Sequence, residues 1–447
     1  MTSLRFSHFS RGLAVATLAA TLGACGIFGG DDPKTTPTIG ERKPVLSRIE
    51  SGASVDPSLA GVAVVLPPAE TNSEWPQAGG TASKSYGHLT LAENPSRAWT
   101  VQIAGGGERR RLAAAPVIGG GMLYAVDTAG VVYAFDAATG ARRWTYRMEV
   151  ADNVQNAAFG GGASYNEGRV YVTNGVGEVA ALDAQTGAEI WKVQPAGPLR
   201  GSPTIAFNSV YVMTQNNQII ALDAATGEEL WNESGSQTQA GVFGVAAPAA
   251  GQGTVIAGYS SGELSAYRYE NGQFLWSDAL ARTSISTEVG SLTDIDADPI
   301  IDNGRVYALG QGGRMAAYEL VTGQRIWELN VAGISTPAIA GEWIFALTDD
   351  AKLLAIAASS GKVRWMTQLQ RYEDEEDREG AIFWTGPVLA GNNLWIASTE
   401  GQIYKVSVAE GSASLFMDLE TSVSLPPVVA NDTLYLLDDG GTIHAFR

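Results

Sequence analysis

Short apolar runs separated by polar turns recur along residues 115–447, with a period of roughly 40–50 residues. The first unit, APVIGGGMLYAVDTAGVVYAFDAATGARRW at 115–144, shows the order of its parts. Pro116 opens one apolar run, Gly turns separate it from runs at 123–126 and 132–135, and an Asp-Ala-Ala-Thr-Gly turn leads to a fourth run that ends at Trp144. Short apolar runs bounded by Gly and Asp are typical of strands joined by tight turns. Each unit therefore predicts a four-stranded antiparallel sheet.

Seven further units keep this order, at 163–191, 202–231, 247–276, 297–327, 336–365, 386–416 and 426–447. Two residues mark the turn and the fourth run. Gly closes the turn in seven units (Gly140, Gly187, Gly227, Gly272, Gly323, Gly361, Gly411), and Trp ends the fourth run in six (Trp144, Trp191, Trp231, Trp276, Trp327, Trp365). A small sheet buries both faces only by stacking on its neighbours. We therefore expect the Trp side chains to be core residues wedged between adjacent sheets.

The last unit stops after its third run, at Arg447. The segment Ser-Arg-Ala-Trp-Thr-Val at 96–101 carries the same Trp and can supply the missing strand. Such pairing closes the ring and removes two exposed edges. The sequence thus predicts an all-β protein, an eight-bladed β-propeller over residues 75–447 whose C-terminal blade is completed by an N-terminal strand.

The N-terminus is typical of a bacterial lipoprotein. Arg5 and Arg11 precede a short apolar run, and Leu-Gly-Ala-Cys at 22–25 resembles a lipobox. We expect residues 1–24 to be a signal peptide, Cys25 to carry the lipid, and residues 25–74, rich in Pro, Thr, Ser and Gly, to be a flexible tether. The apolar stretch VAVVLPP at 62–68 leaves open whether part of this tether binds the propeller.

Charge and composition exclude several functions. The formal charge of −18, or −20 without residues 1–24, opposes binding to nucleic acid. Cys25 is the single cysteine and the mature chain keeps two histidines, His88 and His444, so we expect no catalytic residue, no metal and no cofactor. The acidic run at 373–379 predicts a solvated loop, with a docking patch for a basic partner as the alternative.

The A-L-D-A-x-T-G-x-x-x-W pattern, together with Trp-Pro-Gln-Ala-Gly-Gly at 75–80, resembles the repeat of quinoprotein (PQQ-like) propellers. This resemblance covers residues 75–447 and is specific for the fold, but both enzymes and scaffolds use it. The enzymatic alternative is a PQQ-dependent periplasmic dehydrogenase. Such enzymes need calcium ligands, a catalytic Asp and usually a pair of adjacent cysteines, which a chain with Cys25 alone lacks.

Within this superfamily the chain resembles the BamB family of propeller lipoproteins. The lipobox followed by Gly-Ile-Phe at 26–28, the eight units, and the segments STEV at 286–289 and DIDADP at 294–299 carry the resemblance. It implies a non-catalytic scaffold of the β-barrel assembly machinery, held by its lipid at the periplasmic face of the outer membrane. Unfolded outer-membrane proteins are a second, weaker candidate partner.

The resemblance also implies where the partner binds. Asp294 and Asp296 match acidic residues that face periplasmic domains of the barrel-inserting, BamA-like subunit. A neighbouring loop matches residues 239–246, where Val242 and Phe243 keep the family's apolar character although its Arg is lost. We expect Asp294 and Asp296 to project from one end of the ring.

Overall fold

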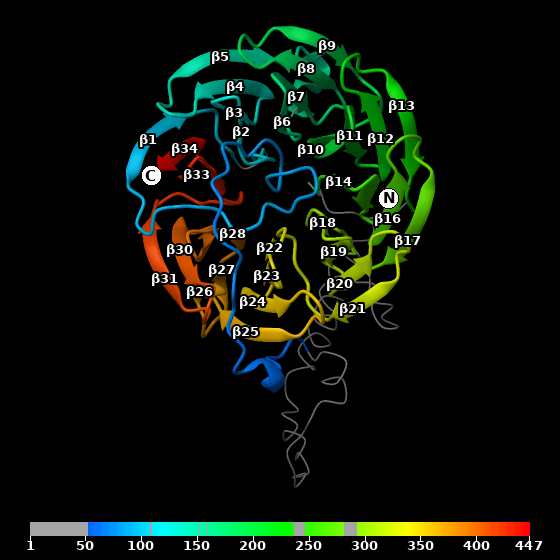
Figure 1. The fold of residues 1–447 in the computed structure, drawn as a ribbon. Coiled ribbons are helices and arrows are strands. Elements are labelled where there is room, and N and C mark those ends of the chain that lie inside the picture. Colours follow the sequence, from blue (N-terminus) through cyan, green and yellow to red (C-terminus); the bar gives the residue numbers. More distant parts are fainter. Residues whose placement is uncertain (1–51, 108–109, 151, 158, 237–245, 281–292) are drawn as a thin grey trace, which may run out of the picture. The chain divides into compact units, whose positions relative to one another are not determined.

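The apolar runs form strands where the sequence predicts them. The computed structural model describes residues 52–107, 110–150, 152–157, 159–236, 246–280 and 293–447. Within these residues, eight four-stranded antiparallel sheets, the blades, form a ring (Figure 1), and one further two-stranded hairpin is present. The predicted eight-bladed all-β propeller is confirmed.

The bounds of the strands follow in blade order. Blade 1 is β2 (Val117–Gly119), β3 (Met122–Val126), β4 (Val131–Asp136) and β5 (Arg142–Arg147); blade 2 is β6 (Ala163–Asn166), β7 (Arg169–Thr173), β8 (Val179–Asp183) and β9 (Glu189–Val193). Blade 3 is β10 (Leu199–Ala206), β11 (Ser209–Thr214), β12 (Gln218–Asp223) and β13 (Glu229–Ser234); blade 4 is β14 (Ala249–Gly251), β15 (Thr254–Gly258), β16 (Glu263–Arg268) and β17 (Phe274–Ala279). Blade 5 is β18 (Ile300–Asp302), β19 (Arg305–Gly310), β20 (Arg314–Glu319) and β21 (Arg325–Leu329); blade 6 is β22 (Ala338–Ala340), β23 (Trp343–Leu347), β24 (Lys352–Ala357) and β25 (Val363–Gln368). Blade 7 is β28 (Trp384–Ala390), β29 (Asn393–Ser398), β30 (Gln402–Ser407) and β31 (Ala413–Asp418); blade 8 is β32 (Val428–Ala430), β33 (Thr433–Leu437), β34 (Thr442–Phe446) and β1 (Arg97–Gln102). The extra hairpin is β26 (Tyr372–Asp374) with β27 (Glu379–Ala381), and two 3₁₀ helices cover Pro57–Leu59 and Asp152–Ala157.

The fourth strand of the first unit is longer than predicted. It continues past Trp144 to Arg147, because Tyr146 and Arg147 still pair with Val132 and Val131 of β4. Its alternating exposure places one row of side chains toward the neighbouring blade and the other toward solvent. No helix in the described ranges is long and apolar enough to cross a membrane.

The repeated Trp and Gly meet at the seams between blades. The indole nitrogen of each of the six Trp residues donates a hydrogen bond to a backbone carbonyl of the following blade, as from Trp276 to Leu320 at 2.8 Å. The turn Gly of the following blade lies against the indole ring of this Trp. A Cβ at Gly323 would stand 2.5 Å from Cγ of Trp276. The predicted wedge is confirmed, and the Gly is required both by its positive φ and by this close approach.

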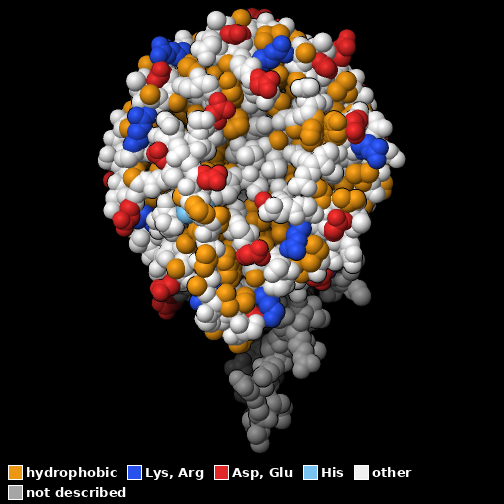
Figure 2. Space-filling view, in the orientation of Figure 1, with side chains coloured by type: hydrophobic (Ala, Val, Ile, Leu, Met, Phe, Trp, Pro, Cys, Tyr) orange, Lys and Arg blue, Asp and Glu red, His pale blue; other side chains and the backbone are white. Residues whose placement is uncertain are grey.

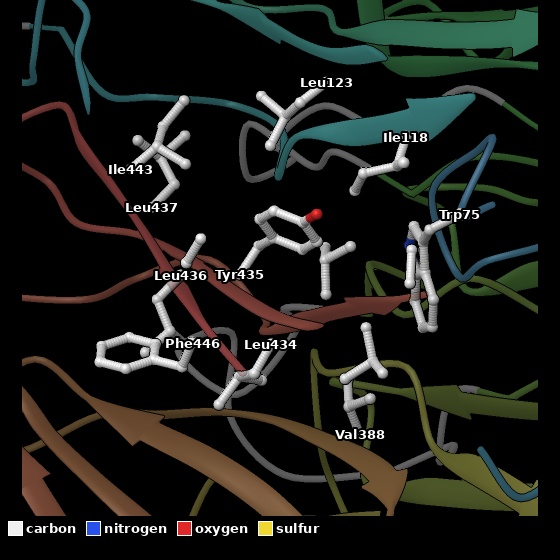
Figure 3. Close-up of a cluster of buried hydrophobic side chains, with 14 of the residues drawn as sticks. Trp75, Ile118, Leu123, Val388, Leu434, Tyr435, Leu436, Leu437, Ile443 and Phe446 are labelled. Atoms are coloured by element: carbon white, nitrogen blue, oxygen red, sulfur yellow. The ribbon is translucent and has the colours of Figure 1, made fainter. Parts of the chain in front are cut away.

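The ring closes as predicted. Strand β1 pairs with β34, with Trp99 opposite Ala445 and Val101 opposite Ile443. Trp99 lies against Gly140 of blade 1, which repeats the seam geometry at the closure. Buried side chains of blades 7, 8 and 1 form one cluster there, and Figure 3 shows Val388, Tyr435 and Ile118 meeting around it with Trp75 at one side.

Residues 52–91, which we call the strap, cross one end of the ring (Figure 1). The strap forms hydrogen bonds with all eight blades; its partners in blade order are Ile118, Tyr165, Ile205, Ala250, Ile301, Val363, Gly391 and Asn431. These partners lie mostly at the ends of the innermost strands, and described atoms fill the centre of the ring at this end (Figure 2). Residues 52–74 are therefore bound to the ring rather than a free tether, which answers the question that the sequence left open for this part; residues 25–51 lie outside the described residues.

The two ends of the ring differ in what they carry. The hairpin end carries two kinds of turn: the turn between the first and second strands of each blade, and the Asp-x-x-Thr-Gly turn between the third and fourth strands. The strap crosses this end. At the connector end, the fourth strand of a blade leads into the next blade, beside the turn that joins the second and third strands. The connector between blades 4 and 5 contains the predicted acidic residues.

Candidate docking site at the connector end

The connector over residues 293–298 is fixed between the turns of blades 4 and 5. The amide of Ile295 donates to the Tyr259 carbonyl at 3.2 Å, and the amide of Gln311 donates to the Asp294 carbonyl at 2.9 Å. The Thr293 hydroxyl donates to the Ser260 carbonyl at 3.1 Å. The segment DIDADP is thus an ordered part of the ring and not a free loop.

Side chains along this connector alternate between two environments, as an extended chain requires. Ile295 and Ala297 are fully buried in two apolar clusters. Ile295 fits because Gly258 has no side chain; a Cβ at Gly258 would stand 2.5 Å from Cγ2 of Ile295. The alternation leaves Asp294, Asp296 and Asp298 on the other side.

Asp296 forms an ion pair with Arg200, the second residue of β10 in blade 3. The distance from Nη2 of Arg200 to Oδ1 of Asp296 is 3.2 Å, and the two side chains are 1% and 8% exposed. Burial raises the pKa of Asp296 to about 6; the Arg200 guanidinium opposes this shift, and Asp294 adds to it. A charge pair this deeply buried fixes the position of both partners, although its net contribution to stability is small.

A second buried cation balances Asp298. Lys84 of the strap is fully buried and donates from Nζ to the Ala78 carbonyl at 2.9 Å and to the Thr204 hydroxyl at 3.1 Å. Burial lowers the pKa of Lys84, and burial raises the pKa of Asp298, while the two charges attract each other and oppose both shifts. Asp298 also accepts a hydrogen bond from the Ala247 amide at 2.8 Å.

The predicted site residues fare differently. The structure brings Asp294 and Asp296 into one connector, as expected, but their side chains do not project from the ring: Asp294 is fully buried and Asp296 is paired with Arg200. The expectation of exposure is wrong because both sides of the connector are buried, with Ile295 and Ala297 on one side and the acids on the other. Val242 and Phe243, like Cys25, lie outside the described residues.

Sequence reasoning missed two functional candidates, Arg200 and Lys84. Arg200 was detectable as a charge two residues before the small-Pro start of an apolar strand. No signal marked Lys84 within the polar stretch TASKSYG at 81–87. Its burial follows from the path of the strap.

The acidic run at 373–379 forms the tip of the β26–β27 hairpin rather than an irregular loop. Its backbone is held by its own carboxylates, since Asp374 accepts from the Glu376 and Asp377 amides at 2.9 and 3.0 Å. The acidic side chains of this hairpin are exposed, as predicted.

The described residues offer no group of side chains that could bind the calcium ion used by quinone enzymes. No three His, Cys, Asp or Glu side chains among them are grouped so that they could hold a metal ion. The buried acids Asp296 and Asp298 are instead matched with Arg200 and Lys84. These residues do not fit a quinone–calcium site.

These features define the class of the protein: an eight-bladed propeller with quinoprotein-type repeats, closed by its own N-terminal strand and crossed by a strap. A family model described as outer membrane protein assembly factor BamB matches residues 86–155 and 128–367. The chain belongs to this BamB family.

Curated relatives agree with this membership. The outer membrane protein assembly factor BamB of Shigella dysenteriae serotype 1 (strain Sd197) is 28% identical over 364 residues, covering 80% of this chain and 91% of the relative. The protein of the same name from Escherichia coli (strain K12) gives the same identity and the same coverage.

Solved structures share the fold. BamB from Moraxella catarrhalis superposes with a TM-score of 0.64 at 19% identity, covering 79% of this chain and 97% of that chain. Quinohemoprotein alcohol dehydrogenase from Comamonas testosteroni gives a TM-score of 0.66 at 15% identity, with 85% and 81% covered. At these identities the likeness concerns the fold alone, and it extends to both a BamB protein and an alcohol dehydrogenase.

Proposed function

We propose that this chain is a non-catalytic scaffold lipoprotein of the β-barrel assembly machinery, which docks through its connector end on periplasmic domains of the barrel-inserting subunit. Its relatives are named outer membrane protein assembly factors. The observation that carries the choice of end is the strap, which covers the hairpin end and bonds to every blade. The connector end is the end without the strap.

Asp294, Asp296, Val242 and Phe243 belong to this proposed docking site, but the two acids act from within the connector. Because their side chains are buried, replacing them by Lys would place new charges inside the ring and destabilise it. Loss of binding by such variants would not separate docking from folding. Exposed apolar residues give a sharper test.

Ile334→Asp should weaken binding to the periplasmic domains of the barrel-inserting subunit by about tenfold or more. Ile334 is 46% exposed in the connector between blades 5 and 6, next in the ring to the acidic connector. The matched control is Val321→Asp. The Val321 side chain is 74% exposed on the turn between β20 and β21, at the hairpin end. Calorimetric titration of both variants should show loss for Ile334→Asp only; equal affinities, or loss for Val321→Asp alone, would place the docking site elsewhere.

The lipid anchor is tested at Cys25. Cys25→Ala should remove the protein from the outer-membrane fraction, since acyl chains supply the membrane affinity of a lipid-anchored protein. Fractionation should be done in cells that lack the other assembly subunits, because a bound partner could retain the unlipidated chain. Continued recovery with outer membrane in those cells would contradict the anchor.

A further inference from the structure

We propose that Arg200 is the positioning residue of the docking site, which neutralises the acidic connector from blade 3 and thereby holds residues 293–298 in place. This inference rests on the proposed docking function of the connector. Nothing in the repeat requires an arginine at this point, since the corresponding position, two residues before the small-Pro start, is Ala113 in blade 1, Ile334 in blade 6 and Trp384 in blade 7.

The geometry joins Arg200 to a connector that belongs to other blades. Arg200 begins β10 in blade 3, whereas Asp296 belongs to the connector that enters blade 5. The connector's backbone bonds through Ile295 and Asp294 reach blades 4 and 5, and the Asp298 amide donates to the Thr336 hydroxyl at 2.9 Å. The ion pair at 3.2 Å links the connector to blade 3.

The charges around Asp296 explain why a cation is needed there. Asp294 lies on the same connector, Asp349 on the turn of blade 6, and both repel a charged Asp296. Asp298 on the connector is balanced by Lys84 of the strap. Arg200 is the cation that donates a hydrogen bond to Asp296. Without Arg200, the buried Asp296 carboxylate would face those of Asp294 and Asp349 with no cation paired to it. Moving Asp296 into water would then lower the free energy of the connector.

Linkage gives the pH dependence of this arrangement. Burial raises the pKa of Asp296 to about 6 in the seated connector, while a solvated Asp titrates near 4. Between about pH 6 and pH 4, Asp296 therefore binds a proton when the connector is in its observed, buried position but not when Asp296 is in water. Low pH consequently favours the buried position of the connector. A proton can then replace the neutralising effect of Arg200.

Hydrogen exchange of Arg200→Met tests the inference without a partner. At pH 8, peptides containing Ile295 and Gln311 should lose protection by about tenfold or more after correction for the intrinsic rate, because both amides bond to or from the connector. At pH 5 the loss should shrink to about threefold or less, since protonated Asp296 no longer needs the guanidinium. Arg200→Lys, which keeps a cation, should restore part of the protection at pH 8.

The matched control is Arg305→Met. Arg305 lies in blade 5 and donates to the Ala358 carbonyl at 3.2 Å, at the hairpin end. Its replacement should leave the protection of Ile295 and Gln311 unchanged. Unchanged protection in Arg200→Met at pH 8, or a loss equal at pH 8 and pH 5, would overturn the positioning role; the second result would indicate packing alone.

Binding separates this inference from the proposed function. Arg200→Met should bind the periplasmic domains of the barrel-inserting subunit about tenfold more weakly at pH 8 and regain affinity near pH 5. If wild-type protein does not bind those domains, the docking function fails while exchange still decides the role of Arg200. If wild type binds and Arg200→Met binds equally well at pH 8 despite a loosened connector, the connector is not the docking element.

Discussion

Lys84→Met should lower the free energy of unfolding by about 3–5 kcal/mol, the range found when one partner of a buried charge pair is removed. Lys84 is fully buried, and Asp298, whose charge it balances, is 7% exposed. The substitution keeps the length of the side chain but removes the positive charge that attracts the Asp298 carboxylate. It also removes the bond to Thr204 that ties the strap to blade 3 and the bond to Ala78 within the strap.

A double-mutant cycle measures the pair by chemical denaturation. Lys84→Met with Asp298→Asn should be less destabilised than the sum of the two single changes, because neutral groups no longer face an uncompensated charge. The control is Lys192→Met. The Lys192 ammonium is partly exposed and lies 3.5 Å from Glu178, so this substitution should change the free energy of unfolding by less than about 1 kcal/mol. Strictly additive losses for Lys84 and Asp298 would show that the two residues do not act as a pair.

Gly323→Ala should cost about 2–4 kcal/mol, and Gly304→Ala in the same blade only about 1 kcal/mol. Both glycines have left-handed backbone angles, with φ of +70° and +75°. They differ in surroundings: a Cβ at Gly323 would stand 2.5 Å from Cγ of Trp276, whereas nothing lies within 4 Å of a Cβ at Gly304. The difference between the two variants therefore isolates the contact at the seam.

Thermal and chemical unfolding of both variants, followed by tryptophan fluorescence, provide the measurement. The larger loss for Gly323→Ala should be accompanied by a changed native spectrum, since Trp276 must move to admit the new methyl group. Equal losses would mean that the backbone angle alone explains the recurring Gly. The Trp would then be packed loosely enough to adapt.

The blades and their seams could be predicted because their signals repeat. Eight copies of one order of runs predict eight similar sheets, and the turn Gly recurs in seven of them and the strand Trp in six, four residues after that Gly. Closure by residues 96–101 followed from the strand missing after Arg447, and β1 pairs with β34 accordingly. Each of these features depends on neighbours along the chain or on the next copy.

The candidate site could be predicted only in part. The segment DIDADP pointed to the correct connector, but its acids were expected to face solvent. Their direction depends on the fit of Ile295 over Gly258, which fixes the alternation of the connector. A period of two predicts two faces, but it does not show that both of them are buried.

What the sequence alone determined is the class of fold, the number of blades and the way in which the ring closes. Only the tertiary structure decided that residues 52–91 cross the hairpin end, that Lys84 and Asp298 are both buried and attract each other, and that Arg200 pairs with Asp296. The physical reason is separation along the chain: Arg200 and Asp296 are 96 residues apart, and Lys84 and Thr204 are 120 apart. Local periodicity specifies strands and turns, whereas a pairing of single charges across a ring depends on where eight stacked sheets bring the chain together.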